Sequence, residues 1–177
     1  VTLIEMLPKI LPVEDAEISK ALATAFDKQG IICRVNTRVD EIEVVEDGVS
    51  LTLNGEKGEE SIMVDSVLLA IGVVPNLQGV FSEKCKVELD RGYIKVDENY
   101  QTSLPQVFAT GDVVGPPWLA HVATFRAVQA VNGMFEHAKP IPLDSFPGCT
   151  YCQPQVASIG LTEEKAKEEG VAYKVGK

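Results

Sequence analysis

Residues 1–35, VTLIEMLPKILPVEDAEISKALATAFDKQGIICRV, contain the pattern that decides the fold. An apolar, β-branched run opens the stretch, and a second short apolar run closes it at residues 31–35. Between the two runs, apolar residues recur at helical spacing, acidic residues precede them, and Gly30 stands where a helix would end. Strand, helix and strand in this order form the repeating unit of a parallel sheet with a right-handed crossover. The stretch therefore predicts an α/β fold.

The next segment, residues 39–72, changes to an alternation of apolar and polar side chains. Turn signals stand at Asp47-Gly48 and around Asn54-Gly55, which predicts an antiparallel meander. The segment ends in SVLLAIG at residues 66–72, a continuous apolar run that we expect to form a buried strand. A parallel sheet with an inserted meander is a mixed α/β architecture.

The second half of the chain predicts fewer regular elements. Residues 75–105 are rich in loops and include one short strand in GYIKVD. VFATGD, residues 107–112, predicts another buried strand, and a helix is expected over residues 119–136 after two prolines.

The last segment, residues 155–175, again predicts strand, helix and strand. Thr162 is the expected N-cap of the helix and Gly170 its C-cap. Because both ends of the chain fall on expected strands, we expect both ends to be cuts through a longer protein.

Composition excludes several functional classes. The 177 residues are 45% hydrophobic and 24% charged, with a formal net charge of −10, which argues against general affinity for nucleic acid or anionic lipid. No apolar run has the length needed to span a bilayer, and no leader pattern is present. Four cysteines are too few for a disulfide scaffold, so we expect a cytoplasmic protein.

Cys149 and Cys152 have the C-x-x-C spacing of a redox pair, half a zinc site, or two structural cysteines. A zinc site needs about four ligands, and neither Cys33 nor Cys85 belongs to a second ligand pair. A thioredoxin-like pair opens a helix, whereas this pair precedes an expected strand. We therefore expect no metal site and regard redox activity of this pair as disfavoured.

Two acidic residues follow expected strands. Glu5 ends the first strand, where an acid in a nucleotide-binding sheet accepts hydrogen bonds from ribose hydroxyls. The alternative is a solvated acid at a strand end, and no glycine-rich turn precedes Glu5 to support the first interpretation. Asp112 follows Gly111, which allows close approach of a ligand backbone or polyol. The alternative there is an ordinary Asp-initiated turn.

The expected helix after residue 118 begins with Leu119, Ala120 and His121, whose backbone amides could serve an electron-rich carbonyl. For His121 we expect the backbone to be the contact, because no nucleophile stands beside the imidazole. Trp118 either packs in the core or covers a flat ring.

Several stretches together resemble the flavoprotein pyridine-nucleotide disulfide oxidoreductases, in the order found in that family and over essentially the whole chain. They are VTLIEMLPKILPVEDAEISKAL, LLAIGVVPN, VDENYQTSLPQVFATGDVVGPPWLAH and PQVASIGLTEEKAKE. Within the family, the match is closest to the members that reoxidise protein-bound dihydrolipoamide.

The resemblance implies a set of NAD-binding residues. Glu5 matches the residue that binds the adenosine ribose, Val39 the one that lies against the adenine, and Gly72 the glycine near the nicotinamide half. Because no arginine pair accompanies Glu5, the resemblance favours NAD over NADP.

The resemblance also implies FAD-binding residues. Asp112, with Gly111 before it, matches the aspartate that holds the FAD ribitol. The four residues Trp118, Leu119, Ala120 and His121 match the segment beneath the flavin ring.

The implied organisation has three parts, all incomplete. Residues 1–72 correspond to a Rossmann-like NAD-binding domain without its first strand and glycine-rich turn. Residues 73–144 correspond to the C-terminal part of an FAD-binding domain, and residues 145–177 to the beginning of an α+β dimerisation domain. The family's C-x-x-x-x-C disulfide and its His-Glu pair have no counterpart here, so we expect no catalytic residue in this chain and no activity from it alone.

By the same resemblance, the parent enzyme would pass electrons from a dithiol through its own disulfide and FAD to NAD+. It would be a homodimer and a component of a 2-oxo acid dehydrogenase or glycine cleavage complex, with no nucleic-acid or membrane partner. Val73 stands where the family commonly has arginine, which leaves the substrate open. The alternatives are a related NAD(P)H-dependent disulfide or metal-ion reductase and a non-catalytic dinucleotide-binding module.

Overall fold

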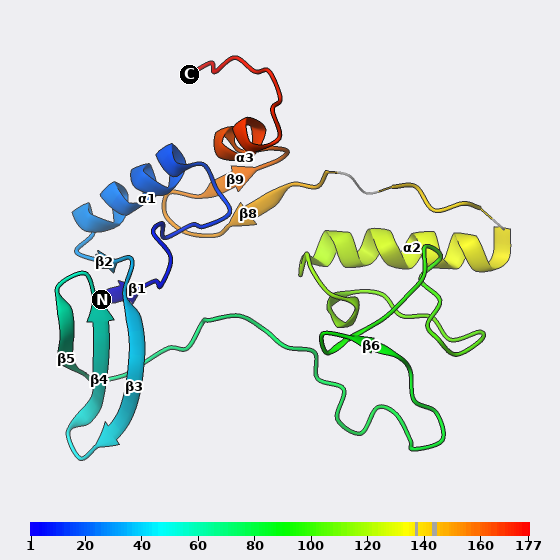
Figure 1. Ribbon diagram of the computed structural model, residues 1–177, viewed down its shortest axis with the longest axis horizontal. Helices are drawn as coiled ribbons and strands as arrows, with labels where there is room; N and C mark the ends of the chain where they lie inside the picture. The colour runs from blue at the N-terminus through cyan, green and yellow to red at the C-terminus, as the bar shows by residue number, and fades with distance from the viewer. Residues whose placement is uncertain (137, 143–144) are drawn as a thin grey trace. The chain divides into compact units, whose positions relative to one another are not determined.

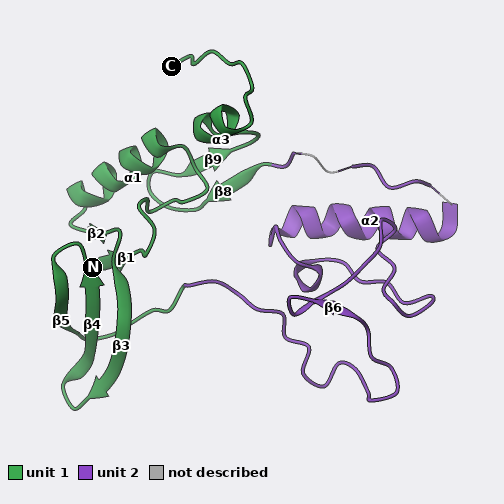
Figure 2. Cartoon of the chain, viewed as in Figure 1, with its two compact units in different colours: residues 1–70, 147–177 green, residues 71–146 purple. Residues whose placement is uncertain are grey.

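The computed structural model describes residues 1–136, 138–142 and 145–177 (Figure 1). The chain divides into two compact units, shown in different colours in Figure 2. Unit 1 joins Val1–Ala70 with Pro147–Lys177, and unit 2 is Ile71–Phe146. Unit 1 is therefore built from two stretches that are distant in the sequence.

Unit 1 begins with the expected strand, helix and strand. Strand β1 (Thr2–Ile4) pairs in parallel with β2 (Ile32–Arg34), and helix α1 (Ala16–Lys28) connects them. The apolar face of α1 is anchored by Leu22, which is 2% exposed. Gly30, with φ of 79°, lies just beyond the helix, where its amide donates to the carbonyl oxygen of Asp27. The predicted parallel pairing is confirmed.

The expected meander is also present in unit 1. Strands β3 (Arg38–Val45), β4 (Gly48–Gly55) and β5 (Gly58–Val64) form an antiparallel sheet in this order. Leu51 and Leu53 on the central strand are buried, Leu53 completely. Gly48 makes the first turn with φ of 145°, and a Cβ there would lie 2.5 Å from the carbonyl oxygen of Val64. Only glycine is accommodated at that position.

The C-terminal part of unit 1 is a hairpin followed by a short helix. Strand β8 (Gly148–Thr150) pairs antiparallel with β9 (Val156–Ser158), and α3 (Glu163–Glu168) lies beside the start of α1 (Figure 1). The expected N-cap is confirmed, because the hydroxyl of Thr162 accepts a hydrogen bond from the Lys165 amide at 3.1 Å.

Unit 2 contains one long helix and several short elements. Strands β6 (Leu89–Asp90) and β7 (Tyr93–Ile94) form a small hairpin, and the 3₁₀ helix η1 (Asp112–Val114) precedes helix α2 (Ala120–Glu136). Helix α2 begins one residue after its expected start and packs through Val122, which is 1% exposed, and Ala130, which is 3% exposed.

Three of the expected strands are not formed: residues 66–72, 107–112 and 171–175 have no strand assignment. A strand is held by hydrogen bonds to a neighbouring strand, and none lies beside these segments among the described residues. Leu68 and Ile71 are 90% and 94% exposed, so the predicted burial of the first segment is wrong. Residues 107–112 contribute only an isolated bridge through Phe108. The mixed α/β class is nevertheless confirmed by the parallel pair and the meander.

Candidate functional site

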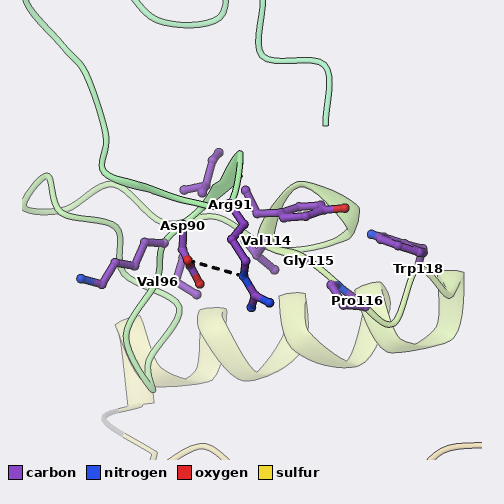
Figure 3. A pocket seen from close by; sticks show the side chains of 10 residues that line it. Asp90, Arg91, Val96, Val114, Gly115, Pro116 and Trp118 are labelled. Carbon is purple, nitrogen blue, oxygen red and sulfur yellow. Dashed lines mark ion pairs between the residues drawn. The ribbon is translucent and has the colours of Figure 1, made fainter. Parts of the chain in front are cut away.

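The aromatic pair of Tyr93 and Trp118 is the centre of the candidate site in unit 2. Their ring centroids are 6.2 Å apart, and the rings are stacked with an interplanar angle of 30°. Both side chains line a pocket of ≈ 360 Å³, shown in Figure 3, and a neighbouring pocket of ≈ 140 Å³. The larger pocket is bordered by the ion pair of Arg91 and Asp90, whereas the smaller one is bordered by Asp112. We assign the candidate cofactor contact to the smaller pocket, because it contains the predicted carboxylate.

Arg126 holds the loop that carries Trp118. From helix α2, its Nη1 donates to the carbonyl oxygen of Gly115 at 3.3 Å, and its Nη2 donates to that of Pro116 at 3.1 Å. The sequence did not predict that the Arg126 guanidinium would bind two backbone carbonyl oxygens. The missed signal was helical spacing, because Arg126 lies four residues after the buried Val122 and so on the packed face of α2.

Gly111 and Asp112 lie where a ligand could approach the backbone. Gly111 has φ of 83°, a conformation that favours glycine, and a Cβ there would lie 3.7 Å from the Cβ of Ala123 on α2. Asp112 begins the 3₁₀ helix η1, and its side chain is exposed at the smaller pocket. Among the described residues, its carboxylate makes no hydrogen bond or ion pair, so both oxygens remain available to hydroxyl groups of a bound polyol.

The start of helix α2 differs in one respect from the expectation. The Leu119 amide was expected to be available to a ligand. It instead donates to the carbonyl oxygen of Pro117 at 3.0 Å. The helix begins at Ala120, and the first amides of an α-helix have no carbonyl partner within the helix. The Ala123 amide donates to the carbonyl oxygen of Leu119, so the candidate donors to a ligand carbonyl are the amides of Ala120 and Val122.

The predicted NAD residues are only partly brought together. Glu5 ends β1, its amide donates to the carbonyl oxygen of Arg34, and its Oε1 accepts from the Leu7 amide at 2.8 Å. The Thr37 amide donates to the carbonyl oxygen of Glu5 at 3.1 Å, which places Glu5 beside the segment leading into Val39 on β3. Gly72, with φ of 125°, belongs to unit 2.

The cysteine pair lies in the β8–β9 hairpin. Cys149 is exposed on β8, and the thiol of Cys152 contacts the carbonyl oxygens of Thr150 and Pro154 at 3.5 and 3.1 Å. Neither residue opens a helix, so the macrodipole that activates thioredoxin-like thiols is absent from this hairpin. In the part of the chain that the structure describes, no group of three or more His, Cys, Asp and Glu side chains could hold a metal ion.

None of the helices in residues 1–136, 138–142 and 145–177 is both long enough and apolar enough to cross a bilayer.

The sequence matches the family model described as pyridine nucleotide-disulphide oxidoreductase over residues 1–127. The chain belongs to this family. Residues 146–177 match the model of the dimerisation domain of the pyridine nucleotide-disulphide oxidoreductases. FAD and NAD are the cofactors of the family.

Curated relatives match along the whole chain. Dihydrolipoyl dehydrogenase from Zymomonas mobilis is 40% identical over 99% of this chain and 38% of its own length. Mitochondrial dihydrolipoyl dehydrogenase from Pisum sativum is 38% identical over 100% of this chain and 36% of its own length. Leghemoglobin reductase from Glycine max is 38% identical over 100% of this chain and 34% of its own length. The chain thus spans little more than a third of the length of these relatives.

Solved structures of flavoprotein reductases have the same fold. LpdA from Mycobacterium tuberculosis is 27% identical with a TM-score of 0.82, and the match covers 97% of this chain and 37% of LpdA. The HOCl-induced flavoprotein disulfide reductase RclA from Escherichia coli is 26% identical with a TM-score of 0.81, over 96% of this chain and 39% of RclA. The names of these relatives support the assignment of the chain to an oxidoreductase family.

Proposed function

We propose that the chain forms part of an FAD-dependent oxidoreductase that reoxidises protein-bound dihydrolipoamide with NAD+ as acceptor. The observation that carries the proposal is the 40% identity to a dihydrolipoyl dehydrogenase over 99% of the chain. The whole enzyme is a cytoplasmic homodimer that associates through residues 146–177 and serves a 2-oxo acid dehydrogenase or glycine cleavage complex.

In this proposal, unit 2 binds and orients FAD, which supplies the group that accepts and passes on electrons. Asp112 accepts hydrogen bonds from ribitol hydroxyls, and Gly111 allows the polyol to approach the backbone. Support comes from the exposed Asp112 carboxylate, which has no partner among the described residues and lies beside the pocket that Trp118 lines. Trp118, Leu119, Ala120 and His121 run beneath the flavin ring, where amides of the first turn of α2 stabilise negative charge.

Unit 1 binds the adenosine half of NAD in the same proposal. Glu5 accepts hydrogen bonds from the ribose hydroxyls, and Val39 lies against the adenine. Glu5 is already oriented, because its Oε1 accepts from the Leu7 amide at 2.8 Å. A carboxylate repels a 2′-phosphate, so the site favours NAD over NADP. Gly72 contributes to the nicotinamide half.

The dithiol chemistry falls to residues outside these 177. None of the four cysteines, Cys33, Cys85, Cys149 and Cys152, forms the C-x-x-x-x-C spacing of the family's redox disulfide. The 177-residue chain by itself therefore holds FAD weakly and turns over no dihydrolipoamide.

The test uses the full-length protein, in which NAD+-dependent oxidation of dihydrolipoamide is followed by the absorbance of NADH. Asp112→Asn should weaken FAD binding roughly tenfold or more, because a charged hydrogen-bond acceptor is lost. Glu5→Gln should raise the KM for NAD+ and narrow the preference for NAD over NADP. Glu98→Gln, which removes an exposed acid from unit 2, is the matched control and should change neither quantity.

Other results would favour the alternatives. A flavin-containing protein that reduces disulfides or metal ions with NAD(P)H but leaves dihydrolipoamide unchanged would favour the related reductases. A protein that binds NADH without flavin would favour the non-catalytic module.

A further inference from the structure

The segment that enters helix α1 is bonded at three consecutive residues to the segment around helix α3. In each bond, a side chain from one segment contacts the other segment, across more than 140 positions of sequence. The bonds are Ser158 Oγ to Glu14 Oε1 at 3.0 Å, Glu163 N to Asp15 Oδ1 at 2.7 Å, and Ala16 N to Glu164 Oε1 at 3.1 Å. Glu14 is buried, at 6% exposed, so its bond to the Ser158 hydroxyl satisfies a carboxylate removed from water.

Two of these bonds cap the helices reciprocally. Asp15 stands at the N-cap of α1 but makes no side-chain cap there, and instead accepts from Glu163, the first residue of α3. Glu164 of α3 in turn accepts from Ala16, the first residue of α1. First-turn amides have no partner in their own helix, and carboxylates near helix N-termini are stabilised by the macrodipole. The start of α1, which has no side-chain cap of its own, is thus capped by Glu164, and at α3 the bond from Asp15 adds to the cap that Thr162 already makes.

Glu164 also reaches the middle of the loop between β1 and α1. Its Oε1 lies 3.7 Å from Lys9 Nζ, and the same Nζ donates to the carbonyl oxygen of Glu14 at 2.7 Å. Its second oxygen, Oε2, is buried and has no hydrogen-bond partner among the described residues. Through Oε1, the Glu164 carboxylate thus contacts both Lys9 in the middle of the loop and Ala16, the first residue of α1.

The same loop begins at Glu5, the proposed ribose ligand. The Leu7 amide fixes the Glu5 carboxylate at 2.8 Å, and the carbonyl oxygen of Leu7 accepts from the Asn36 amide at 3.1 Å. Residues 6–15 contain no helix or strand, so their path depends on such contacts. We infer that Glu164 is a positioning residue for the NAD site, which holds the loop that orients Glu5. This inference rests on the function proposed for Glu5.

The test compares Glu164→Ala with Glu168→Ala in the full-length enzyme. Glu168 lies on the same helix, its side chain is 70% exposed, and its ion-pair partner among the described residues is Lys165. Glu168→Ala therefore removes the same charge as Glu164→Ala without removing a contact to the loop. Loss of a capping carboxylate opens a helix end about tenfold more often. Glu164→Ala should therefore accelerate hydrogen exchange of the Ala16 amide about tenfold. The KM for NAD+ should rise about two- to tenfold with kcat unchanged, by the factor by which the population of the ordered loop falls. Glu164→Gln, which keeps an acceptor for Ala16, should restore part of the loss, and Glu168→Ala should behave as wild type.

The outcomes separate this inference from the proposed function. An unchanged KM for NAD+ in Glu164→Ala, in an enzyme whose wild type uses NAD+, would overturn the positioning role and leave the proposed function standing. A fall in kcat of Glu164→Ala with no change in KM would also overturn the positioning role, since that result indicates general damage to the enzyme. A wild-type protein that binds no NADH would overturn the proposed function and this inference together, whatever happens at Ala16.

Discussion

The two units of the molecule differ in where their hydrogen-bond partners come from. In unit 1, the three strands of the meander pair with one another, and α1 and α3 cap each other. In unit 2, the described strands are two pairs of residues, and the loop before α2 is bonded by the Arg126 side chain in addition to its own backbone turns. Unit 1 thus relies on paired strands and buried leucines, whereas unit 2 relies on one helix, on backbone bonds within turns and isolated bridges, and on side-chain contacts.

This difference explains where local sequence signals succeed. Alternating side chains and Asp-Gly turns predict a meander because each strand's partner is its neighbour in sequence. An apolar run such as residues 66–72 gives no information about its partner, and the same run is exposed when no strand lies beside it.

The largest effect is expected from Leu53→Ala in the meander. Leu53 is completely buried, so the substitution leaves a cavity and should lower the free energy of unfolding by about 2–5 kcal/mol. Val44→Ala on β3, where the side chain is 82% exposed, is the control and should cost less than about 0.5 kcal/mol.

Urea titration followed by circular dichroism measures this loss, and fluorescence of Trp118, the only tryptophan, reports on unit 2 in the same titration. If the units depend on separate contacts, the fluorescence midpoint should stay where it is in wild type. If the midpoints of the circular dichroism and fluorescence transitions shifted by the same amount, the two units would not be stabilised by separate contacts.

A smaller effect is expected from Arg126→Met in unit 2. The substitution keeps much of the apolar stem but removes the donors to the carbonyl oxygens of Gly115 and Pro116, which should cost about 1–3 kcal/mol. The fluorescence of Trp118 should change because the loop that carries it is released. Arg91→Met removes an 89% exposed arginine as control, and an identical fluorescence change in both variants would contradict the role given to Arg126.

The stability of unit 1 should vary with pH in part because of Glu164. Hydrogen bonds from the backbone amides of Glu164 itself and of Ala16, with the positive charge of Lys9, lower the pKa of Glu164 below its ordinary 4.5, against desolvation and the charge of Glu163. A carboxyl group whose pKa is lowered on folding stabilises the protein above its unfolded pKa and loses this effect as pH falls through its folded pKa.

The stability difference between wild type and Glu164→Gln should therefore be constant from pH 7 to about pH 5 and shrink below about pH 4.5. Chemical denaturation at several pH values measures it, with Glu168→Gln to subtract the change in net charge. If the stability difference instead grew as pH fell, its pH dependence would have the opposite sign to the one expected. That result would contradict the contacts assigned to the Glu164 carboxylate.

The smallest effect is expected from Lys95→Gln, which removes the exposed ion pair of Lys95 with Glu88 in unit 2. The two atoms are 3.3 Å apart, but both side chains are about two-thirds in solvent. Exposed pairs contribute little, so the free energy of unfolding should change by less than about 0.5 kcal/mol. A loss comparable to that of Arg126→Met would mean that surface charges, and not the loop contacts, stabilise unit 2.

The elements that local patterns specify were predictable. Helix α2 was expected from residue 119 and begins at Ala120, and Thr162 was expected to cap α3 and does. The roles of Arg126 and Glu164 were not predicted, since their partners lie outside the helix that carries each of them. The candidate cofactor residues were named mainly through family resemblance, because a strand-end acid such as Glu5 has no distinctive local signal.

The bond between Ala16 and Glu164 spans 148 residues, which has a consequence for how the protein is made. During translation at about 5–20 residues per second, roughly 7–30 s pass between synthesis of the first partner and of the second. Throughout that interval the amide at the start of α1 is capped by water or by another molecule, while all of unit 2 is being synthesised. The start of α1 therefore receives its cap from Glu164 only late in synthesis, so the contacts between α1 and α3 cannot guide the first steps of folding.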